Sequence, residues 1–149
     1  MTTGWTFHMD YGRHTAGRRS MSKAEASNSA MKDEALTGRV IDCFLVVYNE
    51  LGFGFTESVY SAALEILFRE AGIDARREHT VDVLFRGTRV GTYRVDYLVE
   101  GQLVLELKAG HQLPPGSRAQ MLTYLRTLRK QLGLVLFVGP TPEVERVSC

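Results

Sequence analysis

Two carboxylates and a lysine occupy segments of the chain that otherwise have the pattern of buried β-strands. In LVLELKAG (residues 103–110), Glu106 and Lys108 alternate with three leucines. Alternate residues of a strand share a face, so Glu106 and Lys108 point to one side and the leucines to the other. Asp96 stands on the preceding predicted strand, at the opposite parity to its apolar neighbours. A short connection makes the two strands antiparallel neighbours, and an aligned register would bring the three charged side chains together.

Such a cluster needs a counter-charge. Two carboxylates in close contact repel each other, and burying them with a single lysine is costly without compensation. A divalent cation, Mg²⁺ or Mn²⁺, would compensate, since Mg²⁺ binds one or two carboxylates together with water and substrate phosphate and lowers the pKa of bound water. A neighbouring lysine can stabilise developing charge or help to deprotonate that water. The cluster predicts hydrolysis of a phosphodiester, and it is equally compatible with a cross-strand salt-bridge pattern on a solvated sheet face.

The elements that position these residues follow from periodicity and from helix and turn signals. The expected elements are a helix from about Lys32 to Leu51, a helix from Thr56 to Gly72, strands over 79–85, 90–99 and 102–108, a helix from Ser117 to Leu132 and a strand over 133–139. This order, helix-helix-strand-strand-strand-helix-strand, predicts an α/β fold with a mixed sheet flanked by helices. The last strand, near Leu136, is expected to extend the sheet at its edge after the third helix crosses over.

The charged residues and their spacing resemble a known motif. Asp96, followed by Glu106-Leu107-Lys108 on the next strand, resembles the core motif of the PD-(D/E)XK nuclease superfamily, whose fold is restriction-endonuclease-like. The resemblance implies that Asp96 and Glu106 bind the metal, that the Leu107 carbonyl is a further ligand and that Lys108 is the catalytic lysine.

Two further motifs narrow the resemblance. The segment GFTESVY fits G-x-x-E-x-x-Y, with Gly54, Glu57 and Tyr60 at the matching positions. The segment QMLTY fits Q-x-x-x-Y, with Gln120 and Tyr124, a pattern that some exonuclease branches of the superfamily place on the helix after the ExK strand. The ordered set resembles the bacterial GxxExxY protein family, a small branch of the superfamily, from about the first helix to VERV.

These motifs imply additional site residues, each with an alternative. Glu57 would contribute a carboxylate, although the helix dipole also favours a glutamate in a first turn. Gln120 and Tyr124 share a helix face that would meet the site or the DNA backbone, although a tyrosine there also suits the core. The chain departs from the family at Phe137, where relatives typically carry an asparagine.

Composition limits the classes of protein. The 149 residues are 44% hydrophobic and 23% charged, as in ordinary globular domains. A net charge of +1 gives no global attraction to nucleic acid, so any such binding depends on local charge. Cys43 and Cys149 have neither metal-ligand nor disulfide spacing, and the sequence contains no membrane-spanning apolar run. We therefore expect a cytoplasmic protein that does not bind membranes.

Residues 1–30 differ from the rest of the chain. They are rich in Thr, Gly, Ser and Ala and have no sustained period, which predicts a disordered tail before a nuclease-like domain over 31–149. Arg13, Arg18 and Arg19 leave open a nucleic-acid-binding arm.

Two functions are compatible with the sequence. The first is a Mg²⁺-dependent nuclease that hydrolyses DNA, rather than RNA, by metal-activated water. The alternative is a non-catalytic module of the same fold that acts through homo-oligomer assembly or partner binding. The intact Asp96, Glu106 and Lys108 favour the enzyme, whereas the near-zero net charge favours the module.

Overall fold

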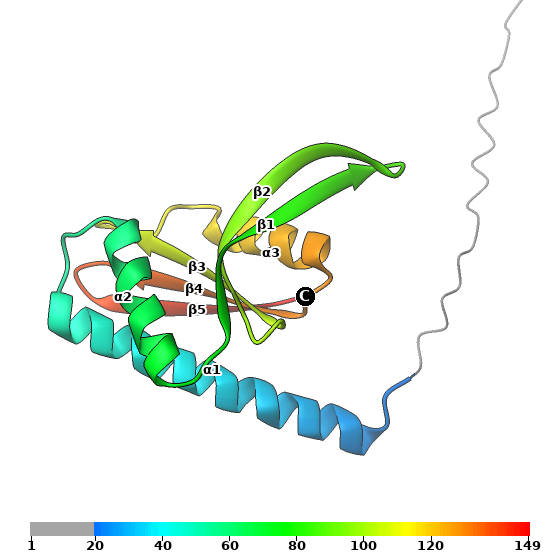
Figure 1. Ribbon diagram of the computed structural model, residues 1–149, viewed down its shortest axis with the longest axis horizontal. Helices are drawn as coiled ribbons and strands as arrows, with labels where there is room; N and C mark the ends of the chain where they lie inside the picture. Colours follow the sequence, from blue (N-terminus) through cyan, green and yellow to red (C-terminus); the bar gives the residue numbers. More distant parts are fainter. Residues whose placement is uncertain (1–19) are drawn as a thin grey trace, which may run out of the picture.

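A computed structural model describes residues 20–149 as three helices and a five-stranded sheet (Figure 1). The elements are α1 (Lys23–Leu51), α2 (Glu57–Glu70), β1 (Ala75–Phe85), β2 (Thr88–Val99), β3 (Leu103–Ala109), α3 (Ser117–Leu128), β4 (Leu132–Val138) and β5 (Pro142–Ser148). The sheet order is β1-β2-β3-β4-β5, with β3 and β4 parallel and the other pairs antiparallel. The predicted mixed α/β sheet is confirmed, and so is the antiparallel pairing of the strands that carry Asp96 and Glu106.

The first helix begins well before Lys32, where it was expected. Ser22 caps it, because the Ser22 hydroxyl accepts a hydrogen bond from the Glu25 amide at 3.2 Å and the Ser22 amide donates to the Glu25 carboxylate at 2.8 Å. Residues 21–32 are exposed, so this part of α1 has no buried apolar stripe from which to predict it. The expected tail boundary at residue 30 falls inside α1, and the rest of the expected tail, residues 1–19, lies outside the described residues.

The strand near Leu136, β4, extends the sheet beside β3 after α3, as expected, but it does not form the edge of the sheet. β5 pairs with β4 along its whole length and forms that edge instead. Its residues are mostly exposed or half-buried, and a short edge strand of this kind has a weak apolar signal. α3 also ends earlier than predicted, at Leu128, where Arg129 adopts a left-handed conformation.

Two cores hold the helices against opposite faces of the sheet. α1 and α2 pack on the face that carries Leu103, Leu105 and Leu107. α3 packs on the other face, through Met121, Tyr124 and Leu125 against Val104 and Val135. The strand alternation therefore directs Glu106 and Lys108 toward the α3 side.

Gly133 of β4 lies directly beneath α3. A Cβ atom there would lie against Met121 Sδ and 2.9 Å from Met121 Cγ, and Met121 is fully buried. We expect Gly133→Ala to lower the free energy of unfolding by about 1–3 kcal/mol through overpacking. Chemical denaturation measures this loss, and the same substitution should cost less in a Met121→Ala background. An equal cost in both backgrounds would exclude the clash as its cause.

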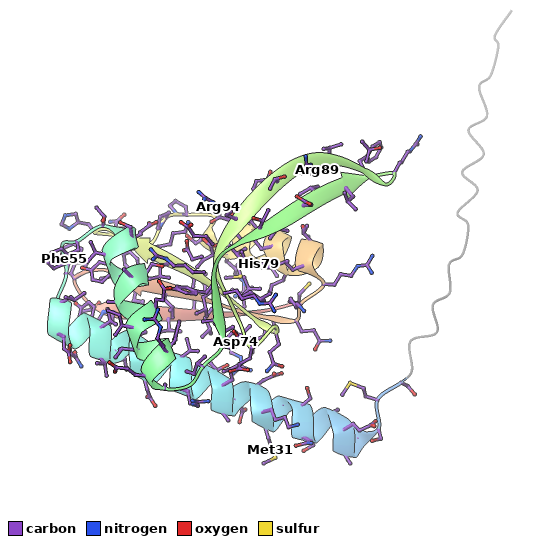
Figure 2. All side chains as sticks on the ribbon, in the orientation of Figure 1. Met31, Phe55, Asp74, His79, Arg89 and Arg94 are labelled. Carbon is purple, nitrogen blue, oxygen red and sulfur yellow. The ribbon has the colours of Figure 1, made fainter. Side chains whose placement is uncertain are left out.

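β1 and β2 form a long hairpin that extends past the rest of the domain (Figure 1). Four large apolar side chains of the hairpin are more than half exposed: Leu84 62%, Phe85 62%, Val90 62% and Tyr93 52%. Arg89 and Arg94 also project from it (Figure 2). Leu84, Phe85 and Val90 lie toward the tip of the hairpin, whereas the Tyr93 ring contacts Tyr124 of α3, with centroids 6.1 Å apart.

Among residues 20–149, none of the helices has the length and apolar character that crossing a bilayer requires.

Candidate active site

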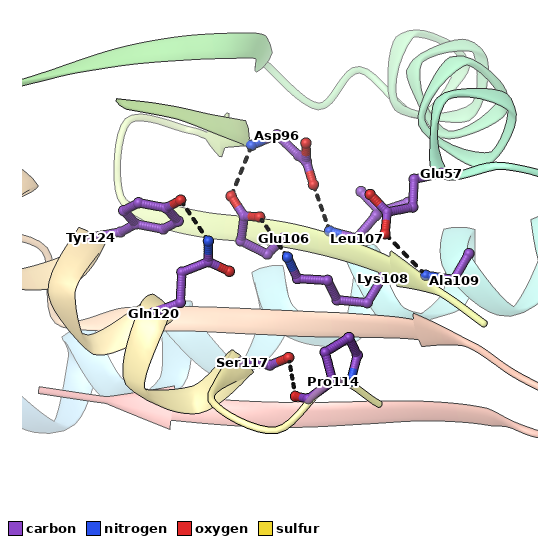
Figure 3. Close-up of polar contacts among 10 residues, drawn as sticks. All are labelled: Glu57, Asp96, Glu106, Leu107, Lys108, Ala109, Pro114, Ser117, Gln120 and Tyr124. Carbon is purple, nitrogen blue, oxygen red and sulfur yellow. Dashed lines mark hydrogen bonds and ion pairs between the residues drawn. The ribbon is translucent and has the colours of Figure 1, made fainter. Parts of the chain in front are cut away.

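The backbone ladder between β2 and β3 stops where the two carboxylates begin. Its last pair is Tyr97 with Leu105. Beyond that pair, the Asp96 amide donates to Glu106 Oε1 at 3.2 Å and the Leu107 amide donates to Asp96 Oδ2 at 2.7 Å (Figure 3). Each carboxylate thus replaces a ladder hydrogen bond, and both are fixed in the same gap between the strands.

This arrangement leaves oxygen atoms available for a cation. Asp96 Oδ1 and Glu106 Oε2 accept no hydrogen bond from the residues that the structure describes. The N–H and C=O groups of a strand residue point to the same neighbouring strand, so the Leu107 carbonyl faces this gap as its amide does. Within residues 20–149, no group of three or more His, Cys, Asp and Glu side chains is arranged to hold a metal. A pair of carboxylates with one carbonyl nevertheless fits Mg²⁺, which keeps several waters.

Burial makes the carboxylate pair hard to ionise in the absence of a cation. Burial, and next the nearby Asp96 carboxylate, raise the pKa of Glu106 to about 8. Burial also raises the pKa of Asp96, although the hydrogen bond from Leu107 and the charge of Lys108 oppose it. Lys108 Nζ lies 4.0 Å from Glu106 Oε2, at the limit of an ion pair, and does not offset the burial. The positive charges beside the two carboxylates therefore do not offset their burial, and a divalent cation would supply further positive charge.

The GFTESVY segment brings α2 to the end of β3. Glu57, in the first turn of α2, accepts a hydrogen bond from the Ala109 amide at 3.3 Å (Figure 3). The fully buried Tyr60 donates its hydroxyl to the Gly52 carbonyl at 2.5 Å and accepts from the Phe55 amide at 3.1 Å. Gly54 has a φ of 125°, which side-chain-bearing residues rarely adopt. The three motif residues thus shape the loop over 52–56 and dock it beside β3.

Gln120 and Tyr124 lie next to Glu106 but bind each other. Gln120 Nε2 donates to the Tyr124 hydroxyl at 2.9 Å (Figure 3). Tyr124 is buried; burial and the charge of Glu106 both raise its pKa, which places its ring close to that carboxylate. Tyr124 is therefore part of the core and of the wall of the site, whereas Gln120 is exposed beside it.

Sequence reasoning missed Arg77. It pairs with Tyr97 across β1 and β2, and its positive charge opposes, in part, the rise in the pKa of Asp96 that burial causes. A hollow of about 190 Å³ beside the site is lined by Glu57, Ser58, Ser61, Arg77, Glu78 and Asp96. Arg77 also forms an ion pair with Glu65 at 3.1 Å. The register of the β1–β2 hairpin would have indicated this position, but a bulge at Val83/Leu84 obscures that register in the sequence.

Comparisons with known proteins agree with this architecture. The crystal structure of SSO0001 superimposes with a TM-score of 0.50 at 15% identity over 61% of the chain, which shows a shared fold. The match spans about half, 48%, of that protein. A search of curated proteins found no significant match. The family model of the PD-(D/E)XK nuclease superfamily matches residues 34–147, so the chain belongs to the PD-(D/E)XK nuclease superfamily.

Proposed function

We propose that this protein is a Mg²⁺- or Mn²⁺-dependent nuclease that hydrolyses phosphodiester bonds of DNA. The observation that carries the proposal is the convergence of Asp96 and Glu106 in one gap between β2 and β3, with Lys108 beside them. Membership of a nuclease superfamily supports the same reaction class. A pair of carboxylates whose pKa values are raised by burial is typical of a functional site.

Each residue has a chemical task in this proposal. Asp96 Oδ1, Glu106 Oε2 and the Leu107 carbonyl would hold the cation. When bound, the cation would polarise the phosphodiester and lower the pKa of a water molecule. Lys108 would stabilise negative charge that develops on the phosphate, because its ammonium group is already held beside Glu106. Glu57 would fix the end of β3 through Ala109, and Gln120 with Tyr124 would form a polar wall toward the DNA backbone.

Contacts within the GFTESVY segment support placement in the bacterial GxxExxY branch. Gly54 takes a backbone conformation that favours glycine, Glu57 reaches β3 and Tyr60 fastens the loop over 52–56. Glycine tolerates the positive φ at position 54, and the Glu57 carboxylate and the Tyr60 hydroxyl make the hydrogen bonds to Ala109, Gly52 and Phe55. The motif would thus serve to position the helix beside the catalytic carboxylates.

A cleavage assay tests the proposed reaction. We expect the purified protein to cut DNA with Mg²⁺ or Mn²⁺, to cut RNA more slowly and to be inactive in EDTA. Glu106→Gln, purified in the same way, controls for contaminating nuclease. Cleavage that persists in this variant, or no cleavage of single- or double-stranded DNA or RNA with either metal, would contradict the proposal.

A second function, assembly of a non-catalytic module, is supported by the exposed apolar surface of the β1–β2 hairpin. Exposed apolar patches of this kind often mark protein interaction sites. A light-scattering mass above that of one chain, together with an inactive wild type, would favour this second function over hydrolysis.

A further inference from the structure

A groove lies beside the carboxylate pair, on the far side of Glu57. It has a volume of about 640 Å³ and is lined by two segments, residues 53–58 and 109–111. Glu57 and Ser58 also line the hollow that contains Asp96, so the two spaces adjoin. Small-molecule sites commonly measure roughly 300–1,000 Å³, which makes the groove large enough for part of a nucleotide.

The groove presents oriented aromatic rings. Phe55 is 51% exposed and Phe53 is 38% exposed, and Phe55 lies at the end of the molecule away from the hairpin that carries Arg89 (Figure 2). The Phe53 ring contacts His111 edge-on, with centroids 5.2 Å apart. The Phe55 ring contacts Tyr60 edge-on at 6.1 Å, and its amide is held by the Tyr60 hydroxyl. Rings that are fixed and yet exposed are suited to stacking on a ligand.

The backbone keeps this groove open. Gly54 and Gly110 both have positive φ, at 125° and 155°. An added Cβ at Gly54 would have no atom of the described structure within 4 Å, so the space above it is free. The Tyr60 hydroxyl fixes the loop over 52–56 through hydrogen bonds with the Gly52 carbonyl and the Phe55 amide. The loop conformation thus holds Phe53 and Phe55 toward the solvent, where their rings contribute little to the stability of the hydrophobic core.

We propose that this groove is a subsite for an unstacked nucleobase, on which Phe55 and Phe53 stack while an adjoining phosphate lies at Asp96 and Glu106. The inference rests on the proposed function and narrows the substrate to single-stranded or locally unpaired nucleic acid. Bases inside a duplex are stacked on one another and cannot reach such rings, whereas every unpaired base offers an aromatic face. The position of the groove next to the carboxylates favours a nucleobase over a protein side chain.

Binding measurements without cleavage test the subsite. A single-stranded oligonucleotide containing 2-aminopurine is titrated with protein in the presence of Ca²⁺ in the Lys108→Ala background, which should bind the metal without cleaving the oligonucleotide. We expect quenching of the fluorophore, and we expect Phe55→Ala to weaken binding about 5- to 150-fold and to reduce the quenching, because stacking contributes roughly 1–3 kcal/mol per base. Phe55→Trp should retain both signals. Phe85→Ala removes another exposed phenylalanine, from the tip of the distant hairpin, and should leave the quenching unchanged.

The outcomes separate this inference from the proposed reaction. If the quenching depends on Phe55 but the wild type does not cleave nucleic acid, the subsite proposal stands and the nuclease proposal is rejected. Cleavage by the wild type with equal binding by Phe55→Ala and Phe85→Ala would reject the subsite and retain the nuclease. Absence of oligonucleotide binding would overturn the subsite, and so would a Phe55→Ala effect on light-scattering mass instead of on quenching, because the groove would then be a self-association surface.

Discussion

Asp96→Asn should abolish Mg²⁺-dependent cleavage, with a loss of at least about 100-fold. It should also remove the rise in melting temperature that Mg²⁺ causes in the wild type by binding the folded state. The metal-free variant should be as stable as the wild type or slightly more stable. Asparagine can still accept the hydrogen bond from the Leu107 amide, and the substitution removes the repulsion between Asp96 and Glu106. Cleavage assays and melting curves with and without Mg²⁺ measure these effects.

Lys108→Ala is the matched comparison. It should lose cleavage to a similar degree but retain metal binding, because an ammonium group is not a metal ligand. Calorimetric titration of Mg²⁺ or Mn²⁺ into the three proteins distinguishes these effects. If the cluster is only a salt bridge, both substitutions should destabilise the protein mildly and Mg²⁺ should not change the melting temperature of any of the three. A wild type that binds no metal at millimolar concentrations would reject the catalytic interpretation.

Glu106→Gln should stabilise the metal-free protein at high pH. The pKa of Glu106 is about 8 in the folded protein, against an ordinary value of 4.5. Below about pH 4.5 the Glu106 carboxyl is protonated in both the folded and unfolded states, so it does not lower the stability of the folded protein. As the pH rises from 4.5 to 8 the unfolded chain releases this proton while the folded state retains it, so the wild type loses stability. Glutamine does not titrate and avoids this loss.

Melting curves in EDTA between pH 4.5 and pH 9 measure the difference. We expect the variant and the wild type to melt at similar temperatures near pH 4.5, and the variant to melt at least about 5 °C higher near pH 9. Glu70→Gln replaces an exposed glutamate at the end of α2, and its melting temperature should change with pH as that of the wild type does. If the melting temperatures of Glu106→Gln and the wild type changed with pH in the same way, burial of Glu106 would not destabilise its ionised form.

The convergence of Asp96, Glu106 and Lys108 could be predicted because strand parity and a short connection determine it. In both strands apolar residues flank the charged ones, and a tight connection at Glu100 and Gly101 leaves an antiparallel arrangement as the simple solution. The sequence could not indicate that the ladder would end at Tyr97 and Leu105 and that the carboxylates would complete it. That detail depends on how the hairpin bends away from the sheet.

The missed features share a physical cause. The start of α1 is exposed and β5 is an edge strand, so neither buries enough apolar surface to produce a clear period. The capping-box pattern at Ser22 and Glu25 was present and would have located the helix start. Arg77 and Phe55 meet the site through tertiary packing between elements distant in sequence, which local patterns do not encode.

The position of β5 also affects how the chain folds as it is synthesised. All seven residues of β4 are buried, and β5 follows it after a short turn. Until β5 leaves the ribosome, β4 has a bare edge of unpaired backbone groups flanked by apolar side chains, which can template pairing with a neighbouring chain. The ladder closes when Cys149 donates its amide to the Gln131 carbonyl at 3.0 Å. A nascent chain that stalls or terminates before β5 would therefore be more prone to aggregate than one in which β5 has paired with β4.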